Sequence, residues 1–131
     1  MNRRTSVLLG LFIVIVIGLA LTVGLMGGQS AGSVCKGNSS PVAHKVVIKD
    51  GKVSDGHVKG KLCDTLTIIN DDSVTREVAF GPHEHHVPYD GIAERLLSKN
   101  QSLTITLNQA GSFHWHDHIH DEVEGYFAVS K

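Results

Sequence analysis

Residues 111–125 read GSFHWHDHIHDEVEG, a stretch that combines a strand pattern with a high density of histidine. Histidine occupies every second position from residue 114 to residue 120, while Phe113, Trp115 and Asp117 stand in the positions between. In an extended strand, successive side chains point to opposite faces. The pattern therefore predicts a β-strand with one apolar face that packs into a core and one imidazole face that binds metal.

A second histidine cluster lies in residues 81–90, which read GPHEHHVPYD, so that seven of the nine histidines fall in the two segments. Neutral imidazole is the commonest protein ligand of zinc and copper, and nitrogen and oxygen donors without sulfur favour Cu(II) or Zn(II). Carboxylates serve either as ligands or as partners that orient an imidazole. The predicted ligands are His83, His85, His86, His116, His118 and His120, with Glu84 and Asp117 as the carboxylates. The alternative is a solvated, pH-responsive histidine surface.

The strand pattern leaves a geometric question open. If the alternation persists to residue 118, His116 and His118 point away from Asp117. They then meet the histidines of residues 83–86 only if that loop folds over the same face of the sheet. Otherwise two separate sites are expected, one inside near Asp117 and His120 and one outside.

The N-terminus carries a membrane-targeting signal. Residues 7–26 are uncharged and apolar, and about 20 such residues are needed to span a bilayer as a helix. We predict that residues 1–28 are a membrane anchor or a signal peptide, and the length of the apolar run favours an uncleaved single-pass anchor. Arg3 and Arg4 would remain in the cytoplasm and place the rest of the chain outside it. Cleavage near Ser30 would instead release a secreted domain.

Residues 29–41 are rich in Gly, Ser and Asn and predict a flexible tether, which leaves residues 42–131 as one folded domain. Without Arg3 and Arg4, the chain keeps 10 of its 12 basic residues against all 13 acidic ones, a net charge of −3. This balance argues against a nucleic-acid partner. The two cysteines, Cys35 and Cys63, form one disulfide in an oxidising compartment, or alternatively two thiol ligands.

Short apolar-alternating segments with turn residues between them predict an all-β sandwich. The segments are residues 44–49, 65–70, 74–80, 103–107 and 126–129. The long connection after residue 80 carries the first histidine cluster, and residues 92–97 (IAERLL) are expected to form a short helical turn.

The order NDDSVTREVAF, a long loop, a Leu-Thr-Ile-Thr strand and AGSF with a ligand-rich loop resembles the cupredoxins of the plastocyanin and amicyanin type. The resemblance covers residues 42–131 and implies a Greek-key β-sandwich. The closing motif of amicyanin-like sequences is Gly-x-Tyr-x-Tyr-x-Cys-x-x-His-x-x-Met-x-Gly. This chain matches it at Gly111, Phe113, Trp115, His120 and Gly125.

The type 1 copper positions of that family fall here on Arg76, Asp117, His120 and Val123. Only His120 keeps the family's ligand, and a type 1 site depends on a cysteine thiolate. The electron-transfer role of the family is therefore not expected here. Instead, Arg76 and Asp117 are expected to form a buried ion pair in place of the metal.

The sequence is also similar to a divergent group of exported cupredoxin-like proteins with a Pro-His-x-x-His loop and a strand ending in Tyr-His-Asp-His-Leu. Pro82, His83 and His86 match the loop, and residues 116–118 match the strand end, which implies that the two clusters belong together. The expected function is binding of Cu(II) or Zn(II) outside the cytoplasm, for sequestration, sensing or transfer. The alternative is a metal-free interaction module at the cell surface. An enzyme is disfavoured, because no nucleophile is recognisable.

Overall fold

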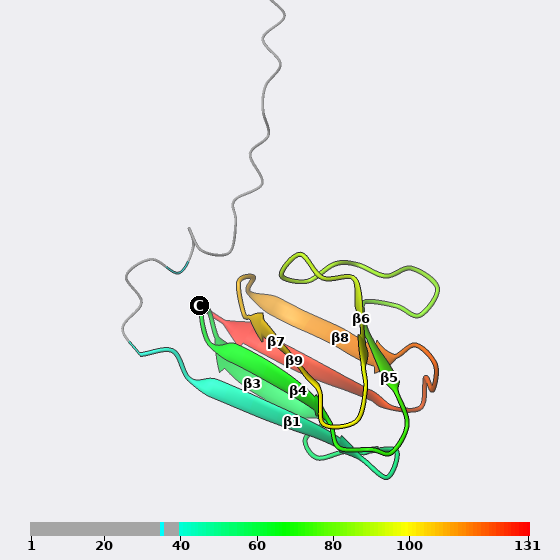
Figure 1. The fold of residues 1–131 in the computed structure, drawn as a ribbon. Coiled ribbons are helices and arrows are strands. Elements are labelled where there is room, and N and C mark those ends of the chain that lie inside the picture. The colour runs from blue at the N-terminus through cyan, green and yellow to red at the C-terminus, as the bar shows by residue number, and fades with distance from the viewer. Residues whose placement is uncertain (1–34, 36–39) are drawn as a thin grey trace, which may run out of the picture.

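The computed structural model describes Cys35 and residues 40–131, which form nine β-strands in two stacked sheets (Figure 1). No helix occurs in this described part, so an all-β sandwich is confirmed there. Accordingly, no helical segment between residues 40 and 131 is suited to crossing a membrane. The anchor predicted at residues 1–28 and all of the tether predicted at 29–41 except Cys35, Ser40 and Pro41 lie outside the described residues.

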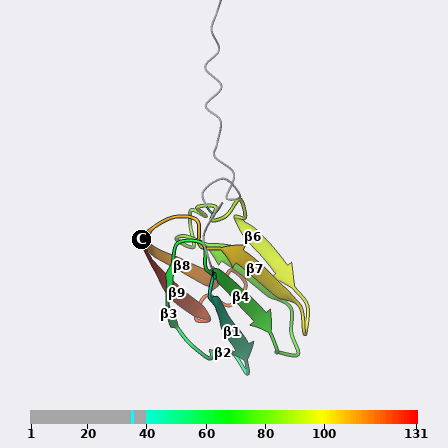
Figure 2. The same cartoon turned by 90° about the vertical axis from the view of Figure 1, so that its left-hand side faces the viewer.

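The first sheet contains four strands in the order β2-β1-β4-β7, seen together in Figure 2. Their bounds are Ala43–Lys49 for β1, Lys52–Val53 for β2, Thr65–Asn70 for β4 and Ser102–Thr106 for β7. β1 runs parallel to β4, and β4 runs antiparallel to β7. Val46, Ile68 and Leu103 lie in one row across these three strands and are all buried.

The second sheet contains five strands in the order β3-β9-β8-β5-β6. Their bounds are His57–Lys61 for β3, Arg76–Phe80 for β5, Glu94–Leu97 for β6, Gly111–Asp117 for β8 and Glu124–Ser130 for β9. β3 pairs in parallel with β9, and the other pairs are antiparallel.

The prediction of a helical turn at residues 92–97 is wrong, because residues 94–97 form the edge strand β6. Its four residues pair with β5, from Ala79 opposite Glu94 to Arg76 opposite Leu97. So short a segment has little intrinsic preference for a helix, and the unpaired edge of β5 offers it a full set of backbone partners.

The core lies between the two sheets. It contains Trp115, Phe80 and Phe127 from the five-stranded sheet, packed against aliphatic side chains of the four-stranded sheet. Trp115 has Gly125 opposite it on β9, and a Cβ at Gly125 would lie 2.6 Å from the indole nitrogen. The indole therefore fills space that only glycine leaves open.

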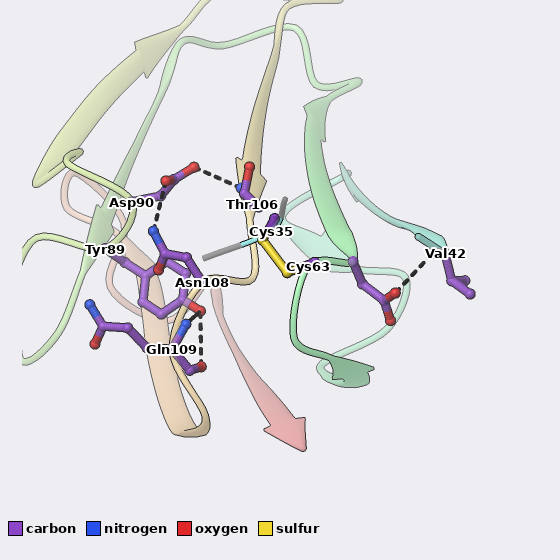
Figure 3. The surroundings of a disulfide bond; sticks show 9 residues. Cys35, Val42, Cys63, Tyr89, Asp90, Thr106, Asn108 and Gln109 are labelled. Carbon is purple, nitrogen blue, oxygen red and sulfur yellow. Dashed lines mark hydrogen bonds between the residues drawn. A yellow bond between two sulfur atoms is a disulfide. The ribbon is translucent and has the colours of Figure 1, made fainter. Parts of the chain in front are cut away.

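Cys35 and Cys63 form the predicted disulfide, shown in Figure 3. Their Cα atoms are 5.4 Å apart, and the bond ties the segment before β1 to the turn between β3 and β4. Neither cysteine is free, so the alternative of two thiol ligands is excluded.

Candidate metal centre

The outer face of the five-stranded sheet carries a row of four residues around His116. Ala79 lies opposite both Glu94 on β6 and His116 on β8, and His116 lies opposite Glu124 on β9. Residues directly opposite in paired strands present their side chains to the same face. His116 is thus flanked by the small side chain of Ala79 on one side and by a carboxylate on the other.

The loop after β5 folds over this outer face, which answers the question that the sequence left open. Gly81, at φ 86°, donates its amide to the His114 carbonyl at 3.0 Å, and the Val87 amide returns to the Phe80 carbonyl at 2.9 Å. The loop thereby brings His83 and His86 against β8. Their ring centroids both lie 4.6 Å from that of His118, and 5.2 and 5.4 Å from that of His116.

Three of these histidines form a group that is suited to a metal ion. One ring nitrogen each from His83, His116 and His118 lies within 4.8 Å of the other two. Metal–nitrogen bonds of about 2.0–2.1 Å in a tetrahedral site place the nitrogens roughly 3.3 Å apart. The group needs to contract by at most about 1.5 Å, and His83, exposed on its loop, has the freedom to rotate inward.

His116 is the least satisfied polar side chain of the group. Only 1% of the residue is exposed, and neither ring nitrogen has a hydrogen-bond partner. Burial lowers the pKa of His116, and the imidazoles of His114, His83, His86 and His118 lower it further. His116 is therefore held neutral with an unused lone pair, which is the form that binds a metal.

His86 contacts the group from the loop side. Its Nε2 lies 3.1 Å from Nδ1 of His118, and its Nδ1 lies 3.1 Å from Oε2 of Glu94. The carboxylate at the cluster is thus Glu94, which the sequence did not indicate. Glu84, proposed for that role, and His85 are both exposed and lie outside the three-histidine group.

His114 contacts the start of the loop after β5, and it was not among the site residues predicted from the sequence. Its Nδ1 lies 3.1 Å from the Gly81 carbonyl and its Nε2 lies 2.9 Å from Oε2 of Glu124. Its ring stacks on that of His116 with centroids 5.4 Å apart. The strand alternation that placed His116 on the outer face also places His114 there, so the signal was present in the sequence.

Arg76 and Asp117, two of the residues aligned with type 1 copper positions, point to the inner side of the sheet and take part in an ion-pair network. Arg76 donates from Nη1 to Asp117 at 2.9 Å and from Nη2 to Asp72 at 2.6 Å, so the expected contact between Arg76 and Asp117 is present. His120 Nδ1 lies 3.3 Å from the same Asp117 oxygen, and the buried Val123 accepts a hydrogen bond from the Asp117 amide at 2.8 Å. Asp117 therefore contacts the guanidinium and His120, and neither Asp117 nor His120 belongs to the three-histidine group.

This network keeps both carboxylates ionised. Burial alone would raise the pKa of Asp117, but the Glu77 amide and the Arg76 guanidinium outweigh it and lower that pKa. Burial likewise works to raise the pKa of Asp72, and the hydrogen bond from Arg76 and two backbone amides lower it. A guanidinium between two carboxylates supplies the positive charge that a metal would supply, so the inner position has no need of an ion.

The two-sheet sandwich of the described residues has a cupredoxin-like fold, because the solved structures similar to it include cupredoxins. No protein-family model matches the chain, and no curated protein matches it. Among solved structures, the chain is similar to a purple cupredoxin from Nitrosopumilus maritimus, with 17% identity over 66% of this chain and 99% of that one and a TM-score of 0.57. Two amicyanin variants match with 24% and 25% identity over 71% and 77% of this chain and 87% and 90% of theirs, each with a TM-score of 0.57.

Proposed function

We propose that the chain is a membrane-anchored protein whose cupredoxin-like domain, outside the cytoplasm, binds Cu(II) or Zn(II) through His83, His116 and His118. The observation that supports this most strongly is the His116 imidazole, buried without a partner where three histidine nitrogens lie within 4.8 Å. An unpaired buried polar group is costly, and a bound metal would satisfy it.

The donor set decides which ions are proposed. Three imidazoles with no thiolate suit Cu(II) and Zn(II), whereas Ca²⁺ and Mg²⁺ prefer oxygen ligands. Without the thiolate of a type 1 centre, the site is proposed to sequester, sense or hand on metal, and not to transfer electrons. The apolar run at residues 7–26 would hold the domain at the membrane surface.

Metal titration of the full-length chain in detergent micelles tests the proposal. At pH 7.5 we expect one Zn(II) or Cu(II) per chain by calorimetry and elemental analysis. A ligand that binds only the folded state stabilises it by about 2.7 kcal/mol at 100 times its Kd, so the melting temperature should rise. His116→Ala should abolish both effects, while His85→Ala, a change on the same loop outside the group, should preserve them. Equal affinities for the two variants would contradict the proposal.

A metal-free interaction module is the second candidate, and the Arg76 network favours it. That network stabilises the inner position without any ion, so the fold does not depend on metal. This candidate predicts a melting temperature that neither ion changes.

A further inference from the structure

Glu94, His86 and His118 form a linear chain of contacts that ends at the three-histidine group. The Glu94 carboxylate lies 3.1 Å from Nδ1 of His86, and Nε2 of His86 lies 3.1 Å from Nδ1 of His118. Three separate parts of the chain supply these residues: β6, the loop after β5, and the turn that directly follows β8. The chain exists because β5 and β6 pair in a register that places Glu94 on the outer face, beside Ala79.

The chemistry of the three groups determines where the protons lie. An ionised carboxylate only accepts hydrogen bonds, so Nδ1 of His86 must carry the proton that it donates to Glu94. In a neutral imidazole the other nitrogen is then an acceptor, so Nε2 of His86 accepts from Nδ1–H of His118. His118 is left with an unprotonated Nε2. That nitrogen is the one free to bind a metal.

We infer that Glu94 and His86 are positioning residues that hold His118 as the Nδ1–H tautomer and present its Nε2 to the metal, an inference that rests on the proposed metal site. A carboxylate that orients a metal-binding histidine directly is a common arrangement, and such partners change metal affinity about 10- to 100-fold. Here a second imidazole lies between the carboxylate and the ligand.

The strand register explains why the contact between Glu94 and the three-histidine group passes through His86. Glu94 and His116 lie on opposite sides of Ala79 in one row, so two strand spacings of about 4.8 Å each separate their backbones. Ala79 has too small a side chain to fill that gap. His86, with a ring centroid 5.4 Å from that of His116, enters from the loop and bridges it. The small residue at position 79 thus makes room for the intermediate imidazole.

The alternative arrangement makes His86 a fourth metal ligand through its own Nε2. That arrangement breaks the 3.1 Å contact between His86 and His118, because the Nε2 lone pair cannot serve both partners. It also frees His118 from any tautomer preference. The two arrangements therefore differ in the protonation of named nitrogens, which nuclear magnetic resonance distinguishes directly.

The test uses full-length chain with ¹⁵N-labelled histidine in detergent micelles, studied by long-range ¹H–¹⁵N correlation. The spectra are recorded at pH 8, where free imidazole is almost entirely neutral. In the metal-free protein we expect His86 and His118 both as the Nδ1–H tautomer, and we expect Glu94→Ala to abolish that preference at both. With Zn(II) added, the resonance of His118 Nε2 should shift and that of His86 Nε2 should not.

Affinity measurements complete the test. Zn(II) should bind Glu94→Ala 10- to 100-fold more weakly than wild type, while Glu84→Ala, which removes an exposed carboxylate from the loop that carries His86, should bind as wild type. An Nε2–H tautomer of His118, a zinc shift at His86 Nε2, or unchanged affinity in Glu94→Ala would each overturn the inference and leave the metal site standing. The expected tautomers without any Zn(II) or Cu(II) binding would support the proton arrangement and overturn the proposed function.

Discussion

Replacing Arg76 by methionine should destabilise the domain more than any single surface change. The guanidinium lies between Asp72 and Asp117 and donates three hydrogen bonds to them, at 2.6, 2.9 and 3.1 Å. All three residues are at most 6% exposed. Methionine fills a similar volume, so the variant chiefly removes the charge and leaves two buried carboxylates without a cation.

The expected loss of stability depends on the hydrogen-bond donors that Asp72 and Asp117 retain in the variant. Breaking a buried ion pair by removing one partner costs about 3–5 kcal/mol. Two carboxylates lose their cation here, but each retains two backbone amide donors. The total loss of stability is therefore less than twice that of one broken pair. We expect a loss of about 4 kcal/mol, which lowers the melting temperature of a domain of this size by roughly 15–30 °C.

The pH dependence of this loss gives a second, independent check. In the wild type the pKa values of Asp72 and Asp117 are lowered, so their contribution is fully present above the ordinary value of about 3.9 and is lost as pH falls through the lowered values. Without Arg76, burial should raise both pKa values above the ordinary range. The variant then takes up protons on mild acidification, and its deficit relative to wild type should shrink from pH 7 to pH 4.5.

Guanidinium denaturation followed by the fluorescence of Trp115, the only tryptophan, measures both effects. Lys49→Met is the matched control, because it removes a cation from an exposed pair with Asp71 and should unfold as the wild type does. A loss below about 1 kcal/mol for Arg76→Met, or a deficit that grows as pH falls, would refute the reasoning.

Three further outcomes are expected. Gly125→Ala places a Cβ 2.6 Å from the Trp115 indole nitrogen and should cost about 1–3 kcal/mol by denaturation, while Gly56→Ala meets no atom within 4 Å and should cost nothing. Cys35→Ser opens a loop of 28 residues and should lower the free energy of unfolding by about 3.5 kcal/mol, and added reductant should reproduce the effect on the wild type. Lowering the pH from 7.5 to 5.5 should release bound Zn(II) or Cu(II) in a dialysis assay, because protons compete with the metal for the imidazole nitrogens. Metal retained in full at pH 5.5 would contradict this expectation.

The features that the sequence predicted correctly depend on local periodicity. Alternation along residues 111–117 placed Trp115 in the core and His116 on the opposite face, because a strand's side-chain period of two holds whatever its partners are. The contact between Arg76 and Asp117 followed from the resemblance to cupredoxins, since aligned positions in one fold lie close together.

The features that were missed depend on pairing between distant segments. Glu94 reaches the cluster only because β6 pairs with the edge of β5, and no pattern within four residues specifies that register. Of the loop residues 84–86, it is His86 and not His85 or Glu84 that contacts Glu94 and His118. A prediction from sequence could place histidines on the loop but could not choose among neighbours, because loop residues lack the periodicity that assigns a face.

Asp117 and His116 are neighbours on β8 but lie in two different environments, one already neutralised by a cation and one without a hydrogen-bond partner. Asp117 points inward to a guanidinium that is part of the chain and always charged, so an ion entering there would have to displace Arg76 and separate it from two carboxylates. His116 points outward, is buried and has no hydrogen-bond partner, so an ion arriving there breaks no existing hydrogen bond of that residue. A metal ion therefore gains more on the outer face, where the loop histidines converge, than at the position that cupredoxins of the type 1 class use. Moving the site by one residue along the strand moves it to the other side of the sheet.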